Sequence, residues 1–287
     1  MTRLKIVAAM VVALSGLSGI AAEASPILAS TLTGRLISFD SATPGTVLTD
    51  VAITGVAGAV VGIDFRPENG ALYAVGNNAG VGTIYSLNTS TGVATSIYTL
   101  TGALSGTSFG VDFNPVPDAL RIVSDTGQNL RITGFPTSTF VTNVDGALGL
   151  TGVVAAAYTN NFSGALTTTL YDIRATDSSL YVQAPPNAGT LTLVGTLGAT
   201  TNTLVGFDVS ATGIAFASLN GGSQFGTVNL ATGAFTLIGS VGGGYAGQVT
   251  GISAVPAIVP EPGTVILLGL GLASTAASAF RRKRTRR

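Results

Sequence analysis

The pattern of apolar and polar positions between residues 25 and 258 indicates a chain built from short β-strands. Stretches rich in Val, Ile, Leu, Thr, Tyr and Phe recur, and Gly, Asn, Asp and Pro separate them. No window shows the sustained 3.6-residue apolar period of an amphipathic helix. Short β-branched runs divided by turn residues are typical of an all-β domain.

The strand pattern repeats along the chain. The motif GIDFRP at 62–67 returns as GVDFNP at 110–115, an offset of 48 residues, and its first half returns as GFDV at 206–209. A degenerate copy, GISA, lies at 251–254, and the missing copy falls near 156–160. Each period of about 46 to 48 residues holds four short strands, which is the size of a β-propeller blade.

The five starts predict an all-β propeller of about five four-stranded blades. Only one strand follows the last start, whereas residues 27–31, 36–40 and 47–54 supply three strands before the first start. We therefore expect strands from the two ends of the domain to share one blade, because this closure leaves no open sheet edge. A β-solenoid and a two-sheet sandwich are the alternatives.

Residues 1–24 have the three-part layout of a secretory signal peptide. Arg3 and Lys5 precede an apolar run at 6–20, and Ala22 and Ala24 form a small-x-small cleavage site. We expect export through the Sec translocon and cleavage by signal peptidase. An uncleaved N-terminal anchor is the alternative, although the run is short for a membrane span.

Residues 259–287 form a second signal. Pro260, Glu261 and Pro262 precede an uncharged apolar stretch at 264–280, which is near the short limit for a spanning helix. A basic tail follows and is expected to stop transfer and to stay in the cytoplasm. Its first residues are Arg281, Arg282, Lys283 and Arg284.

These three parts, in this order, resemble the PEP-CTERM sorting signal of Gram-negative bacteria. The resemblance implies that an exosortase, a membrane cysteine transpeptidase, recognises the tripeptide and cuts near it. It also implies a transient inner-membrane anchor with a cytoplasmic C-terminus, a final place at the cell surface or outside the cell, and an association with exopolysaccharide or biofilm matrix. A plain tail anchor is the alternative.

The stretches FGVDFNP at 109–115, LRIVSDTGQNLR at 120–131, AYTN at 157–160 and QAPPN at 183–187 resemble a bacterial family of unknown function found in secreted proteins. The resemblance covers most of residues 34–243 and implies a propeller-like fold without an assigned activity. Three segments result: a signal peptide at 1–24, a repeat domain at 25–258 and a sorting signal at 259–287.

The composition excludes most catalytic chemistry. The chain has no His and no Cys, and its two lysines, Lys5 and Lys283, lie in the terminal signals. Triads that need His, Cys nucleophiles and the usual zinc sites are therefore excluded. Between the signals, five arginines stand against eleven carboxylates, a charge of −6, so no nucleic-acid partner is expected.

Asp64, Asp112 and Asp208 hold equivalent positions in the repeat. If the first strand of each blade lines the propeller axis, the three carboxylates point toward one another and offer the hard oxygen ligands that Ca²⁺ prefers. The alternative is that each Asp caps the turn after its strand. We expect no cofactor, with calcium on these residues as the exception.

Arg121 and Arg131 flank the turn at 124–128 and lie opposite each other in a symmetric hairpin. Like charges placed opposite are unfavourable unless an anion lies between them. One interpretation is a structural pair neutralised by Asp112, Asp118 or Asp125. The other is a site for an acidic sugar or another external anion.

The sequence thus predicts an exported, exosortase-processed protein that is not an enzyme and that associates with exopolysaccharide. A carboxylate-dependent glycan hydrolase or lyase and a calcium-dependent adhesion module are the alternatives.

Overall fold

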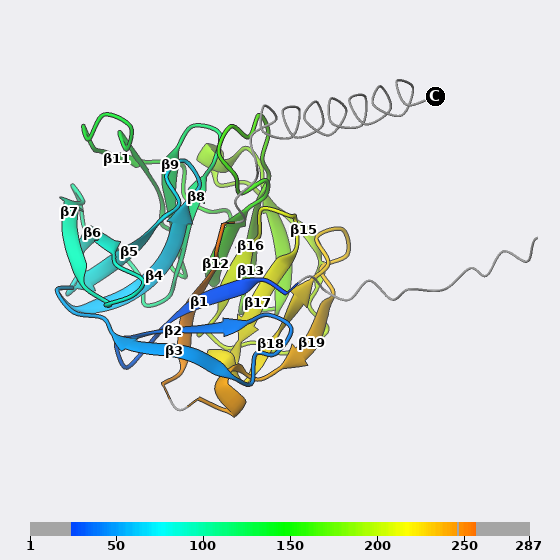
Figure 1. Cartoon of the computed structure of the whole chain (residues 1–287). Coiled ribbons are helices and arrows are strands. Elements are labelled where there is room, and N and C mark those ends of the chain that lie inside the picture. The colour runs from blue at the N-terminus through cyan, green and yellow to red at the C-terminus, as the bar shows by residue number, and fades with distance from the viewer. Residues whose placement is uncertain (1–23, 246, 257–287) are drawn as a thin grey trace, which may run out of the picture.

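The computed structural model describes residues 24–245 and 247–256, and these form a five-bladed β-propeller (Figure 1). Five antiparallel sheets of four strands surround a central axis, and their innermost strands contact one another in ring order. Blade 1 has the strand order β20-β1-β2-β3, and blades 2 to 5 are β4–β7, β8–β11, β12–β15 and β16–β19. The predicted fold is confirmed.

The strands are best described from the axis outward. The innermost strands are β20 (Val249–Ala254), β4 (Ala59–Arg66), β8 (Phe109–Asn114), β12 (Val153–Tyr158) and β16 (Gly206–Val209). The second strands are β1 (Pro26–Thr31), β5 (Ala71–Asn78), β9 (Ala119–Ser124), β13 (Leu170–Arg174) and β17 (Ala215–Leu219).

The outer half of each blade is more exposed than the inner half. The third strands are β2 (Arg35–Asp40), β6 (Val81–Leu87), β10 (Asn129–Thr133), β14 (Ser179–Gln183) and β18 (Gln224–Val228). The outermost strands are β3 (Val47–Ala52), β7 (Ala94–Thr99), β11 (Val141–Val144), β15 (Leu191–Thr196) and β19 (Phe235–Gly239). Three short 3₁₀ turns lie between strands: η1 (Pro186–Ala188), η2 (Asn220–Gly222) and η3 (Val241–Gly243).

The two ends of the domain close the ring as the sequence predicts. Strand β20 pairs with β1, with Ile27 opposite Ala254 and Ala29 opposite Ile252. Strands β1, β2 and β3 therefore complete a blade whose inner strand comes from the other end of the domain. This pairing leaves no unpaired edge between the first and last blades.

Glycines allow the inner strands to approach closely. A Cβ atom added to Gly110 of β8 would lie 2.5 Å from the backbone nitrogen of Ala156 in β12, and one added to Gly206 of β16 would lie 2.7 Å from that of Ile252 in β20. Both distances are too short for a side chain, so the repeated glycine two residues before each Asp sets the width of the axis.

Hydrophobic clusters fill four of the interfaces between neighbouring blades, and the fifth is different. The buried clusters between blades 2 and 3, 4 and 5, 5 and 1, and 1 and 2 each hold nine or more side chains. The cluster between blades 3 and 4 holds six, including Val123, Ala156, Tyr158 and Leu170. Polar side chains occupy the rest of that interface.

Candidate functional site

The three repeated aspartates meet at the propeller axis. Asp64, Asp112 and Asp208 lie on the inner strands β4, β8 and β16, and each residue is 1% exposed. One carboxylate oxygen from each lies within 4.8 Å of those of the other two. The structure thus brings together the three residues that the sequence offered as candidate metal ligands.

Each of these carboxylates connects its blade to the next one. All three accept a hydrogen bond from a backbone N–H of the neighbouring inner strand: Asp64 from Phe113 (2.7 Å), Asp112 from Tyr158 (2.9 Å) and Asp208 from Ala254 (2.6 Å). The turn-capping interpretation is wrong, because these residues lie within strands and their acceptors serve the adjacent blade rather than their own turn.

Two other residues occupy the same level of the ring. Ser253 of β20 accepts a hydrogen bond from the N–H of Phe65 (3.1 Å) and donates one to Asp64 (2.8 Å). Ala157 of β12 holds the fifth position and offers no side-chain oxygen. The axis therefore carries three carboxylates, one hydroxyl and one methyl group.

The axial carboxylates are costly to ionise together. Burial raises the pKa of Asp64 and of Asp112 well above the ordinary range, and repulsion from the neighbouring axial carboxylates raises both further. Burial also raises the pKa of Asp208, to about 6. At neutral pH the cluster needs protons or a cation to balance its charge.

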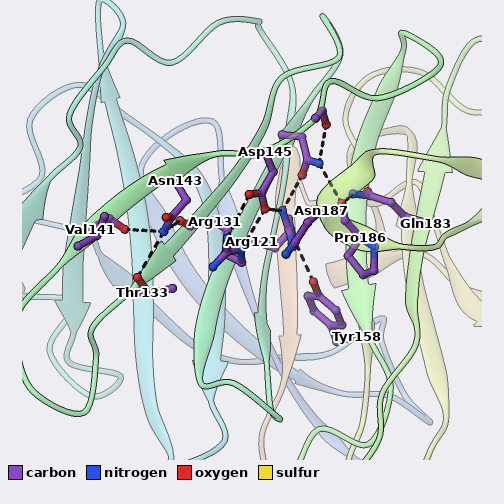
Figure 2. A network of polar contacts seen from close by, with 12 residues as sticks. Arg121, Arg131, Thr133, Val141, Asn143, Asp145, Tyr158, Gln183, Pro186 and Asn187 are labelled. Atoms are coloured by element: carbon purple, nitrogen blue, oxygen red, sulfur yellow. Dashed lines mark hydrogen bonds and ion pairs between the residues drawn. The ribbon is translucent and has the colours of Figure 1, made fainter.

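A second polar cluster lies in the interface between blades 3 and 4 (Figure 2). Arg121 of β9 and Arg131 of β10 are directly opposite in the strand register, as the sequence predicts. The carboxylate of Asp145 lies between them and accepts from Arg121 at 2.8 Å and from Arg131 at 3.0 Å. The two guanidinium groups therefore share one internal anion.

Arg121 is held on all sides. It is 1% exposed and also donates to Asn129 (2.8 Å), to Asn187 (2.7 Å) and to the hydroxyl of Tyr158 (3.3 Å). These partners come from blade 3, from η1 after β14, and from β12, so one side chain connects two blades. Four charge-assisted or polar bonds of this kind fix a buried guanidinium in a single geometry.

The anion between the two arginines is none of the three carboxylates that were expected from the sequence. Asp112 lies in the axial cluster, Asp118 pairs with Arg66, and Asp125 accepts from Thr107 at 2.7 Å. The shared carboxylate is Asp145, directly after β11. The β10–β11 register, in which Leu130 faces Val144, carries it beside the arginines. In the sequence, the only indication of Asp145 is the length of the β10–β11 hairpin, which decides which residue lies beside the arginines.

Asp172 of β13 is a buried carboxylate that the sequence analysis missed. It is 0% exposed, and neither carboxylate oxygen has a hydrogen-bond partner among the described residues. It lies opposite Ala156 in the sheet, on the face that packs toward Val123 and blade 3. Burial raises its pKa to about 8, although the charge of Arg121 acts in the opposite direction.

The Asp172→Asn variant is expected to be more stable than the wild type at pH 8 and to lose this advantage near pH 4. Folded Asp172 keeps its proton up to about pH 8, whereas the unfolded chain releases it near the ordinary value of 3.8. Between these two pH values, unfolding of the wild type releases the proton of Asp172. This group therefore lowers the free energy of unfolding by about 1.4 kcal/mol for each unit by which the pH rises. Urea unfolding of both proteins between pH 4 and pH 8 measures the difference.

The matched control for this prediction is Glu68→Gln, which changes an exposed carboxyl group. Its difference from the wild type should stay small across the same range. An advantage of Asp172→Asn that does not change with pH would mean that the carboxyl group ionises in the folded protein.

The comparison with known families identifies the repeat domain. Residues 35–253 match the family described as "Domain of unknown function (DUF4394)". The chain belongs to this family. The DUF4394 match confirms the resemblance found in the sequence, and the stretches at 120–131, 157–160 and 183–187 that carried it supply Arg121, Tyr158 and Asn187 to the network of Figure 2.

Residues 259–284 match the PEP-CTERM protein-sorting motif. This motif marks a secreted protein that is held by a C-terminal membrane anchor before an exosortase processes it. The sorting residues Pro260, Glu261 and Pro262, the basic stop at 281–284 and Ala22 of the signal cleavage site lie outside the described residues, and Ala24 is the first described residue. Within the part that the structure describes, no helix has the length and apolar character needed to span a bilayer.

Solved structures resemble the DUF4394 domain in fold alone. A chain of the nidogen/laminin complex has a TM-score of 0.51 at 10% identity and covers 81% of this chain and 98% of its own. An auxiliary nutrient binding protein from Bacteroides thetaiotaomicron VPI-5482 has a TM-score of 0.42 at 15% identity. The match covers 66% of this chain and 55% of that protein. TolB from Acinetobacter baumannii has a TM-score of 0.47 at 13% identity, over 81% of this chain and 67% of its own. No curated protein matches the sequence.

Proposed function

We propose that this protein is a non-catalytic component of the cell surface or extracellular matrix of a Gram-negative bacterium. The observation that carries the proposal is the PEP-CTERM motif at residues 259–284, next to a propeller that is complete at Ala254. The last strand of the propeller ends at Ala254, and the motif begins at residue 259, so the motif contributes no strand to the propeller.

The route follows from the two terminal signals. The Sec translocon exports the chain, and signal peptidase removes the first 24 residues. The apolar stretch at 264–280 then holds the protein in the inner membrane, and the basic residues after it stay in the cytoplasm because moving Arg and Lys across a bilayer is costly. The exosortase cuts near the tripeptide and ends this anchoring.

The burial of the three repeated carboxylates and of Asp172 supports a non-catalytic domain. A glycan hydrolase or lyase, the alternative function, needs carboxyl groups that reach the sugar. Asp64, Asp112 and Asp208 gather at the axis, but each is 1% exposed, and Asp172 is 0% exposed. With no His, no Cys and no Lys outside the terminal signals, the domain holds few other groups for catalysis.

Exopolysaccharide is the proposed environment of the processed protein. The support is the role that PEP-CTERM proteins have in exopolysaccharide-producing bacteria, together with a domain surface that holds few charged residues. The exposed residues of the outer strands are mostly Thr, Ser, Val and Leu, for example Thr49, Thr95 and Leu237. The hydroxyl groups of Thr and Ser can exchange hydrogen bonds with the hydroxyl groups of neutral sugars, so such contacts need no charged group on the polysaccharide.

Replacement of Pro260, Glu261 and Pro262 by Ala is expected to leave export intact and to block C-terminal processing. The unprocessed protein should stay in the inner-membrane fraction through residues 264–280, whereas the wild type should leave the membrane and appear with the polysaccharide matrix. Fractionation followed by mass spectrometry of the intact protein reads both cleavage sites.

The control is Pro256→Ala, which changes a proline just upstream of the motif and should be processed as the wild type is. Normal trimming and release of the triple variant would refute the sorting assignment. Recovery of the processed wild type in the medium rather than the matrix, in cells that make polysaccharide, would refute the matrix association while leaving the sorting assignment intact.

A further inference from the structure

The axial carboxylates lack a neutralising partner within the protein. All five arginines of the described residues form ion pairs elsewhere: Arg35 with Asp50, Arg66 with Asp118, Arg121 and Arg131 with Asp145, and Arg174 with Asp177. Asp64, Asp112 and Asp208 therefore bring three buried carboxylates within 4.8 Å of one another without a basic side chain beside them. Three ionised carboxylates this close together repel one another strongly in a buried site.

Two oxygens of this cluster accept no hydrogen bond from a donor group of the described residues. Asp112 uses Oδ1, and Asp208 uses Oδ2, to accept the N–H of the next blade. The other oxygens, Asp112 Oδ2 and Asp208 Oδ1, are buried and accept no hydrogen bond from the residues that the structure describes. The blades of Asp112 and Asp208 flank β12, where Ala157 offers only a methyl group, so no donor separates them. Buried acceptors of this kind call for a donor or a cation.

The cluster is compact enough for its three carboxylates to bind one calcium ion. Ca²⁺ binds oxygen ligands at about 2.3–2.6 Å, so ligands on opposite sides of the ion lie about 4.6–5.2 Å apart. The three carboxylate oxygens lie within 4.8 Å of one another, which is close enough for all three to bind one such ion. Mg²⁺ binds at about 2.0–2.1 Å and demands a tighter octahedron that usually keeps several waters. The hydroxyl of Ser253, 2.8 Å from Asp64, supplies a further neutral oxygen at the same level.

The axis also has a small opening next to the cluster. A cavity of about 10 Å³, enough for about one water molecule, lies between the inner strands. Its lining includes Gly62, Gly110, Gly206 and Gly251, each two residues before an axial Asp or Ser.

We propose that the propeller axis binds one divalent cation, with Ca²⁺ the best fit, through Asp64, Asp112 and Asp208, and with Ser253 beside it. The three carboxylates come from blades 2, 3 and 5, so the ion connects three of the five blades, and the bond of Ser253 to Asp64 extends this connection to blade 1, where the ring closes. This site is independent of how the protein is sorted, because the terminal signals contribute none of its residues.

The test uses protein produced from the complete chain and purified after export. Elemental analysis should find about one calcium per chain. Treatment with EGTA should remove the ion and lower the melting temperature, and free Ca²⁺ at a hundred times its Kd should restore it by about 5–10 °C. The double variant Asp112→Asn, Asp208→Asn should retain less than a tenth of the calcium and should not respond to its addition.

The control is Glu68→Gln, which removes an exposed carboxyl group and should keep the wild-type calcium content and response. If the double variant does not fold, the calcium content of the wild type and the response of its melting temperature to EGTA and Ca²⁺ test the proposal by themselves. A wild-type protein that purifies without metal, and whose melting temperature does not change with millimolar Ca²⁺, Mg²⁺ or Mn²⁺, would overturn the proposal and show that shared protons balance the axis. A response to Mg²⁺ at lower concentration than to Ca²⁺ would overturn the choice of calcium.

Discussion

Removal of residues 25–54 is expected to unfold the propeller. The deletion takes away β1, β2 and β3, three of the four strands of blade 1, and leaves β20 without its antiparallel partner. It also removes large apolar side chains from the interfaces on both sides of that blade. Ile27, Ile37 and Phe39 pack toward blade 5, and Leu28 and Leu36 pack toward blade 2.

The expected loss exceeds what a domain of this size can tolerate. Each of these five buried side chains stabilises the fold by about 1.5–3 kcal/mol, together roughly 10 kcal/mol, while a typical domain is stable by about 5–15 kcal/mol in total. Residues 25–258 should give a β-type circular dichroism spectrum and one cooperative melt as a monomer. Residues 55–258 should give neither the melt nor a monomer, because the edge of β20 that pairs with β1 in the intact domain is exposed and associates.

The control deletion removes residues 257–287, which follow the last strand, and should keep the cooperative melt. A cooperative melt of residues 55–258 at an unchanged temperature would mean that blade 1 is not needed to close the ring.

The sequence predicted the fold because the repeat sits on the innermost strands. Gly110 and Asp112 recur with their equivalents at a fixed spacing, since the glycine sets the distance between inner strands and the Asp accepts a hydrogen bond from the next blade. Closure was predictable for a similar reason, because one strand was left over at 249–254 and three at the start of the domain.

The residues that meet across the interfaces between blades could not be predicted from the sequence. The alternation of side chains along a strand tells which residues share a face, but not which residue of the neighbouring blade they meet. Tyr158 and Asn187 bind Arg121 from positions 37 and 66 residues away, and the repeat does not relate them to it. Asp172 was not predicted as a buried site because it lies on an otherwise apolar face of its strand and belongs to no repeated motif.

Replacement of Arg121 by Leu is expected to destabilise the domain by about 3–5 kcal/mol, which corresponds to roughly 10 °C in melting temperature. The side chain is 1% exposed and binds Asp145, whose carboxylate is 8% exposed. Leucine fills part of the volume but donates no hydrogen bond, so Asn129 and Asn187 lose their donor and Asp145 keeps only Arg131. The nearby Asp172 loses its one favourable charge as well.

Arg131→Leu is the matched control. Arg131 binds the same carboxylate, but its side chain is 26% exposed, and in this variant Asp145 keeps its bond to the buried Arg121. Water can replace part of the lost interaction, so the cost should be about 1 kcal/mol, the range of a partly exposed ion pair. Equal costs for the two variants would contradict the central role of Arg121.

The same two variants separate a structural pair from a site for an external anion. If the arginines held an acidic sugar, the protein without the sugar would suffer their mutual repulsion, and Arg121→Leu would be neutral or stabilising. A uronic-acid oligosaccharide would then raise the melting temperature of the wild type but not of the variant. Because Asp145 already lies between the two guanidinium groups, we expect destabilisation by Arg121→Leu and no response of the wild type to the oligosaccharide. A rise of several degrees with the oligosaccharide, present in the wild type and absent in Arg121→Leu, would instead make this hairpin a binding site in which the sugar competes with Asp145.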